Sequence, residues 1–142
     1  MEKFREIFKG QERAHGCYIK GDINEKGKQT GESRIVRLHP QPDSLWTDHL
    51  SGINSLGIIP INDNNECKWG CIDIDQYPLD HKKIVQQIRQ EKFPLIVCRS
   101  KSGGAHIFSF VQSFIPAKIM RSKLQQISGE LGYAGSEIFP KQ

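Results

Sequence analysis

Two aspartates, Asp73 and Asp75, stand one residue apart within the run Cys71–Asp75. Side chains alternate with a period of two in a strand, so both carboxylates point to one face while Ile72 and Ile74 point to the other. Two aspartates on one face of a strand repel each other unless a positive group lies between them. A divalent cation that prefers oxygen ligands, Mg²⁺ or Mn²⁺, is the simplest such group. The alternative is a solvated strand end with two ordinary surface acids.

Length and charge set wider limits. A chain of 142 residues is expected to form one domain, and a net charge of +4 permits a phosphate-bearing partner without requiring one. The N-terminus is charged, and no run of 18 apolar residues occurs in the sequence. We therefore expect neither secretion nor membrane spanning, and a cytoplasmic location.

The cysteines do not predict a zinc site. Cys67 and Cys71 are separated by three residues, but no second pair follows at zinc-finger spacing. Cys71 and Cys98 fall within apolar runs, where a free cysteine acts as a small core residue. We expect reduced thiols and no bound zinc.

From residue 67 onward, the pattern of apolar residues and helix breakers predicts alternating strands and helices. The predicted elements are a strand over 69–75, a helix from 79 that stops before Pro94, a strand over 95–99, a loop over 100–104, a strand over 105–111, a helix over 116–131 ended by Gly132, and a strand over 137–139. Residues 1–66 are more polar and predict a smaller N-terminal α/β module, with a helix over 2–8 and a strand near 16–19. Together the two parts, 1–66 and 67–142, are expected to form a single catalytic domain.

The order β-α-β-β-α-β is that of an α+β fold of the ferredoxin-like or RRM-like type, with an antiparallel sheet and both helices on one face. In this fold the first and third strands are central neighbours, and the fourth strand flanks the first. That topology predicts that Asp73, Asp75, His106 and Glu137 meet at one end of the sheet. We expect Asp75 and His106 to lie beside each other, and the isoleucines of the first strand to pack against the two helices.

The loop before His106 contains hydroxyls, a lysine and two glycines. Glycines let the backbone approach a ligand closely, and successive amide groups can bind an anion. Basic side chains on both flanks suit phosphate oxygens. The alternative is a plain hairpin that uses Gly103 and Gly104 as its turn. The predicted phosphate-binding residues are Arg99, Lys101, Ser102, Gly103, Gly104 and His106.

These segments resemble successive motifs of the archaeo-eukaryotic primase superfamily, in the primase and primase-polymerase branch of phages, mobile elements and TOTE conflict systems. The resemblance covers about residues 45–142 and rests on four strings in order: His49–Pro60, Cys71–Tyr77, Arg99–His106 and Glu137–Gln142.

The resemblance implies a template-dependent nucleotidyltransferase, a DNA primase or primase-polymerase, acting on single-stranded DNA and nucleoside triphosphates. Asp73 and Asp75 match the metal-binding acidic pair, and Glu137 matches a third acidic position that is more often aspartate. Ser102 and His106 match residues that contact the nucleotide phosphates, and Lys141 follows in the last motif. Two Mg²⁺ or Mn²⁺ ions are implied, with a helicase or nuclease as a further partner. The resemblance also suggests a catalytic core truncated at its C-terminus.

Two rival functions remain. A non-catalytic RRM-like module would stack single-stranded bases on exposed aromatic rings, for which Phe108 and Phe110 are available unless the N-terminal part covers them. A metal-dependent glycosyltransferase also uses an Asp-x-Asp pair, but it needs a longer domain with parallel strands. Of the residues outside these motifs, Trp46, His49 and the N-terminal basic residues are candidates for contacts with template phosphates, with a solvated face as the favoured alternative for most of them. His15, His39 and His81 are assigned to the surface.

Overall fold

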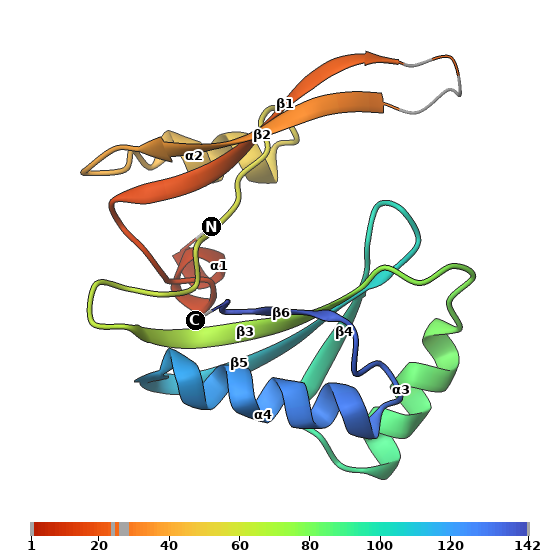
Figure 1. The fold of residues 1–142 in the computed structure, drawn as a ribbon. Coiled ribbons are helices and arrows are strands. Elements are labelled where there is room, and N and C mark those ends of the chain that lie inside the picture. Colours follow the sequence, from red (N-terminus) through yellow and green to blue (C-terminus); the bar gives the residue numbers. More distant parts are fainter. Residues whose placement is uncertain (1, 24, 26–28, 142) are drawn as a thin grey trace.

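Four antiparallel strands form the main sheet of the computed structural model, which describes residues 2–23, 25 and 29–141 (Figure 1). The strands are β3 (Glu66–Ile74), β4 (Leu95–Arg99), β5 (Ala105–Pro116) and β6 (Glu137–Phe139), in the spatial order β4-β5-β3-β6. Two helices, α3 (His81–Gln90) and α4 (Ala117–Glu130), cover one face of this sheet. The predicted β-α-β-β-α-β order and the α+β fold class are therefore confirmed.

The core lies between the sheet and these two helices. Ile72 and Ile74 of β3 are fully buried and pack in one cluster with Ile84 of α3 and Leu124 of α4. Burying each such side chain contributes about 1.5–3 kcal/mol, so the alternation in β3 fixes which face meets the helices. The predicted packing of β3 on both helices is confirmed. Sequence periodicity also predicts an apolar face of α4 that includes Ile119, and this was wrong at Ile119, which is 59% exposed.

Strand β3 ends one residue earlier than predicted. Its last pair is Ile74 with Ala105, the first residue of β5, so Asp75 has no partner residue and lies just outside the sheet. At the other end β3 begins at Glu66, because β5 continues to Pro116 and offers it a partner. Asp75 therefore leaves the strand and enters the connection to α3.

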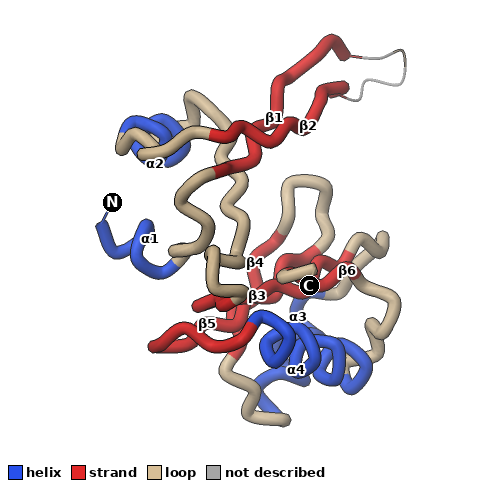
Figure 2. Tube along the Cα trace, turned by 60° about the vertical axis from the view of Figure 1, so that its left-hand side comes forward, coloured by secondary structure: helices blue, strands red, loops and turns tan. Residues whose placement is uncertain are grey.

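The N-terminal part contains α1 (Glu2–Ile7), the antiparallel hairpin β1 (Ala14–Ile23) and β2 (Gln29–Arg37), and α2 (Ser44–Leu50). The helix and the first strand were predicted, whereas β2 and α2 were not, because their polar residues give a weak periodic signal. In both Figures 1 and 2 the hairpin stands apart from the main sheet. No helix in the described ranges is long and apolar enough to cross a membrane.

The face of the main sheet opposite α3 and α4 is partly covered from the N-terminus. The ring of Phe8, just after α1, makes edge contacts with three rings of the sheet, with centroid distances of 5.2 Å to Trp69, 5.5 Å to Phe108 and 5.3 Å to Phe110. Such contacts stabilise beyond the area they bury. The aromatic part of this face is therefore occupied by the chain itself.

The N-terminal part also corrects two expectations. Trp46 is 6% exposed and His15 is 4% exposed, so neither lies on the solvated surface to which it had been assigned. Trp46 makes an edge contact with Phe4, and desolvation by burial lowers the pKa of His15. His39 is exposed, as expected.

Candidate active site

One row of side chains crosses the uncovered end of the sheet. Asp73 of β3 is paired with His106 of β5 on one side and with Glu137 of β6 on the other. His106 is paired in turn with Cys98 of β4. Because directly paired residues point to the same face, this row lies on the side away from α3 and α4. The sheet thus brings an acid, an imidazole and a second acid together from three segments far apart in sequence.

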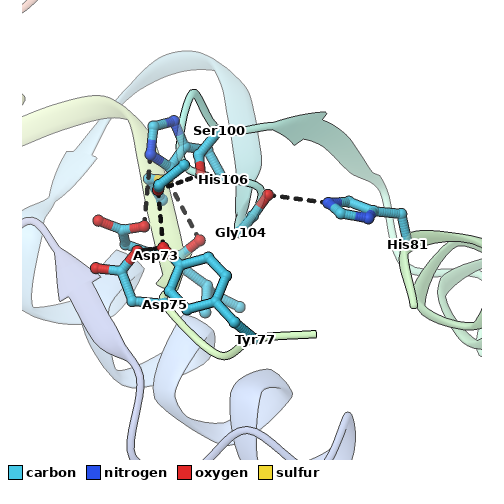
Figure 3. Close-up of polar contacts among 10 residues, drawn as sticks. Asp73, Asp75, Tyr77, His81, Ser100, Gly104 and His106 are labelled. Atoms are coloured by element: carbon cyan, nitrogen blue, oxygen red, sulfur yellow. Dashed lines mark hydrogen bonds and ion pairs between the residues drawn. The ribbon is translucent and has the colours of Figure 1, made fainter. Parts of the chain in front are cut away.

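Asp73 is the centre of this row. Its Oδ1 lies 3.4 Å from Nε2 of His106, as Figure 3 shows. Its pKa is raised, mainly because burial desolvates the carboxylate, and also because Asp75 and Glu137 are negative; the charge of His106 acts in the opposite direction. Oδ1 is buried and has no hydrogen-bond partner among the residues that the structure describes. A cation that approaches this carboxylate would stabilise its ionised form.

The expected neighbour of His106 was Asp75, but its partner across the sheet is Asp73, two residues earlier. The register pairs Asp73 with His106 and Ile74 with Ala105, and β3 ends at Ile74. Asp75 is exposed, and its Oδ1 accepts a 2.9 Å hydrogen bond from the hydroxyl of Tyr77. The two aspartates are therefore held differently, one by the sheet and one by the connection that follows it.

The glycine pair builds the turn between β4 and β5. The Ser100 N–H donates to the Gly104 carbonyl over 2.9 Å, and the Gly103 N–H donates to the Ser100 carbonyl over 3.1 Å. Gly103 has a φ of +96°, which favours glycine, and a Cβ on Gly104 would overlap the Ile74 carbonyl oxygen. The plain-hairpin alternative thus explains both glycines structurally. Phosphate binding by the same loop stays a prediction.

Hydroxyl groups connect this loop to the acids. Tyr77 Oη lies 2.7 Å from Ser102 Oγ, which lies 3.2 Å from Ser100 Oγ. At the start of α3, Nε2 of His81 lies 2.9 Å from the Gly104 carbonyl oxygen (Figure 3). This histidine therefore supports the loop, although it had been assigned to the surface. Its place follows from Asp80, whose carboxylate caps α3 by accepting from the Lys83 N–H.

Sequence reasoning missed Tyr77 and His81. The signal for His81 was its position directly after the helix cap, and the signal for Tyr77 was its closeness in sequence to Asp75. Neither signal specifies a partner, because both contacts are made with the loop 100–104, which folds back from another part of the chain.

The basic residues predicted to bind phosphate differ in whether they have a partner in this site. Arg99 and Lys101 are exposed. Lys141 Nζ lies 2.6 Å from Glu137 Oε1 and 5.2 Å from the centre of the Phe139 ring. Lys141 is thus ion-paired with a predicted metal ligand.

The cysteines differ in exposure. Cys67 and Cys71 are buried, and burial raises their pKa values to about 11 and about 12. Cys98 is exposed, so its assignment to the core was wrong: its strand lies at the edge of the sheet, and Cys98 shares the face of His106.

The acidic side chains of this site offer the type of ligand that a hard divalent cation prefers. Asp73, Asp75 and Glu137 offer only oxygen ligands, and the buried Asp73 Oδ1 accepts no hydrogen bond from the described residues. Within residues 2–23, 25 and 29–141, no three His, Cys, Asp or Glu side chains converge closely enough to hold an ion. Asp75 is engaged by Tyr77 and Glu137 by Lys141. A metal ion bound by Glu137 would compete with Lys141, whereas Asp75 could bind a metal ion through its second oxygen while Oδ1 keeps the hydrogen bond from Tyr77.

Comparison with known proteins gives one family. A family model described as the archaeo-eukaryotic primase domain of TOTE conflict systems matches residues 15–138. No curated protein matches the chain significantly. The matched range includes both aspartates, the loop 100–104, His106 and Glu137.

Proposed function

The chain belongs to the archaeo-eukaryotic primase domain family of TOTE conflict systems, a primase-type nucleotidyltransferase family, and we propose that it joins nucleotides on a single-stranded DNA template. The single observation that carries this proposal is the row of Asp73 between His106 and Glu137, beside the Ser100–Gly104 turn. In this row, carboxylate oxygens that would bind a cation lie next to an imidazole, and hydroxyl groups that would donate to phosphate lie in the adjacent turn.

In the proposed mechanism Asp73, Asp75 and Glu137 hold two divalent ions. Bound there, Mg²⁺ or Mn²⁺ supplies Lewis-acid stabilisation of the charge on the transferring phosphoryl group. The chain's own part is positioning: the sheet fixes Asp73, and Tyr77 holds Asp75. In phosphoryl transfer, positioning and electrostatics account for nearly all of the catalysis.

The loop side of the site is proposed to bind the triphosphate. His106 Nε2 and the hydroxyl of Ser102 act as donors to phosphate oxygens, while Arg99 and Lys101 add positive charge at the exposed rim. His106 contacts Asp73 through Nε2 and follows the loop by two residues, so it is proposed to serve both the acid row and the phosphate region. Lys141 joins the triphosphate side when a metal ion displaces it from Glu137.

The structure favours neither rival function. A base-stacking module needs exposed rings, but Phe8 packs against Phe108 and Phe110. A glycosyltransferase of the Asp-x-Asp type needs parallel strands, and the described sheets are antiparallel.

A primer-synthesis and extension assay tests the proposal. Labelled nucleotides, single-stranded DNA and Mg²⁺ or Mn²⁺ are incubated with the wild type and with Asp73→Ala or Asp75→Ala. We expect transfer by the wild type and none by either variant. Glu91→Ala, at the exposed end of α3, is the matched control and retains activity. Wild-type activity in either aspartate variant refutes the metal roles.

Nucleotide binding is measured separately by calorimetry. Each lost hydrogen bond to a charged phosphate costs about 1.5–3 kcal/mol, so Ser102→Ala and His106→Ala should each weaken nucleotide affinity about 10- to 150-fold. Template affinity should change little. Wild-type protein that binds single-stranded DNA but shows no metal-dependent nucleotide binding would instead be a non-catalytic binding module.

A further inference from the structure

The hydroxyl group of Tyr77 connects the acidic side chains of the site to the loop 100–104. Tyr77 Oη lies 2.9 Å from Asp75 Oδ1 and 2.7 Å from Ser102 Oγ (Figure 3). Tyr77 comes from the connection between β3 and α3, whereas Ser102 comes from the turn between β4 and β5. The residue is 54% exposed, so its ring is not held there by burial in the core.

The order of protons in this chain of hydroxyls follows from the chemistry of the groups. An ionised carboxylate only accepts hydrogen bonds, so the single proton of Tyr77 is donated to Asp75. Ser102 must then donate its own proton to Tyr77 Oη. Ser100 in turn donates to Ser102, since Ser102 has no second proton to give. While these contacts persist, the Ser102 proton is not available to a phosphate oxygen.

We propose that Tyr77 is a positioning residue that fixes the Asp75 carboxylate and competes with the nucleotide triphosphate for the proton of Ser102. This inference rests on the proposed function, because it needs Asp75 as a metal ligand and Ser102 as a phosphate ligand. Nucleotide binding turns the Ser102 hydroxyl from Tyr77 to the phosphate, while the bond from Tyr77 to Asp75 remains. The same tyrosine therefore lowers nucleotide affinity and supports the acid.

Tyr77→Phe separates the two effects, since it removes the hydroxyl and keeps the ring. Without the competing acceptor, nucleotide affinity in Mg²⁺ should tighten about 2- to 10-fold, the value of one ordinary hydrogen bond. Without its tether, Asp75 should be less well placed, and kcat should fall about tenfold or more. Tyr77→Phe should therefore lower both the Kd for nucleotide and kcat. A general loss of structure would instead raise Kd while it lowers kcat.

Calorimetry with nucleoside triphosphate gives Kd, primer extension gives kcat, and thermal melting verifies folding. Tyr133→Phe is the matched control, because this ring packs partly buried against the core near the end of α4 and should change neither constant. In the Ser102→Ala background, Tyr77→Phe should no longer change nucleotide affinity, because the two effects act through one contact.

The outcomes separate this inference from the proposed function. A wild-type chain that neither binds nucleotide nor extends primers refutes the proposed function itself. If the wild type does both, and Tyr77→Phe matches Tyr133→Phe in Kd and kcat, only the role of Tyr77 is refuted. Weaker nucleotide binding by Tyr77→Phe, or an unchanged effect in the Ser102→Ala background, also refutes the competition for Ser102.

Discussion

Gly104 is the position where a single methyl group should disturb the site most directly. Its N–H and carbonyl lie at the start of β5, two residues before His106, and its Cα faces the end of β3. A Cβ added there would overlap the Ile74 carbonyl oxygen and lie 3.2 Å from Ser100 Oγ. The carbonyl belongs to the backbone, so it has no flexible end that can move aside.

The size of the effect follows from this overlap. To relieve it, the loop or the end of β3 must shift by about 1 Å, and overpacking of this kind costs about 1–3 kcal/mol. For a chain of this size the melting temperature should fall by about 3–12 °C. The shift also moves His106 from its place 3.4 Å from Asp73. A displacement of about 1 Å typically costs 100-fold in a rate that depends on positioning.

Thermal or urea denaturation of Gly104→Ala measures the first effect, and nucleotide binding and primer extension measure the second. Gly129→Ala is the matched control, because a Cβ at this exposed position in α4 meets nothing within 4 Å. Alanine there should stabilise the chain by about 0.5–1 kcal/mol, the opposite sign. Wild-type stability and activity in Gly104→Ala would contradict the close approach of Gly104 to the Ile74 carbonyl.

The remaining predictions concern charge and accessibility. Asp73→Asn should raise the free energy of unfolding at neutral pH. The pKa of Asp73 in the folded protein lies above its ordinary value of 3.8, so the wild type loses stability as the pH rises through that folded pKa. Asparagine does not ionise, so the variant avoids this loss. Denaturation across pH 3–8 should show that the difference in free energy of unfolding between variant and wild type becomes smaller in acid. A variant that is less stable than the wild type at neutral pH would contradict this prediction. Cys98, exposed beside His106, should react with maleimide, and nucleotide at ten times its Kd should slow labelling about tenfold. Mass spectrometry of Cys17, which lies outside the site, serves as the control, and equal labelling of Cys98 with and without nucleotide would contradict its place in the site.

The sequence predicted the elements of residues 67–142 well, because each of them carries a strong local signal. Strands over 95–99 and 137–139 were predicted to the residue, and the alternation of Ile72 and Ile74 with the aspartates specified which face meets the helices. The order of the elements then specified the sheet, since few topologies accommodate β-α-β-β-α-β. The same signals are weak in the polar N-terminal part, where β2 and α2 were missed.

The available chemistry can be derived from the sequence alone: two acids of known spacing, a glycine turn that follows two basic residues, and a histidine two residues after that turn. Which of these groups touch was decided by the tertiary structure. The register that places Asp73, rather than Asp75, opposite His106 depends on where β5 begins, and so on the close approach of Gly104 to Ile74. The contacts of Tyr77 with Ser102 and of His81 with Gly104 join segments more than 20 residues apart. A pattern read along one segment specifies where its side chains point, but not which distant segment they meet, because that depends on how whole strands and helices pack.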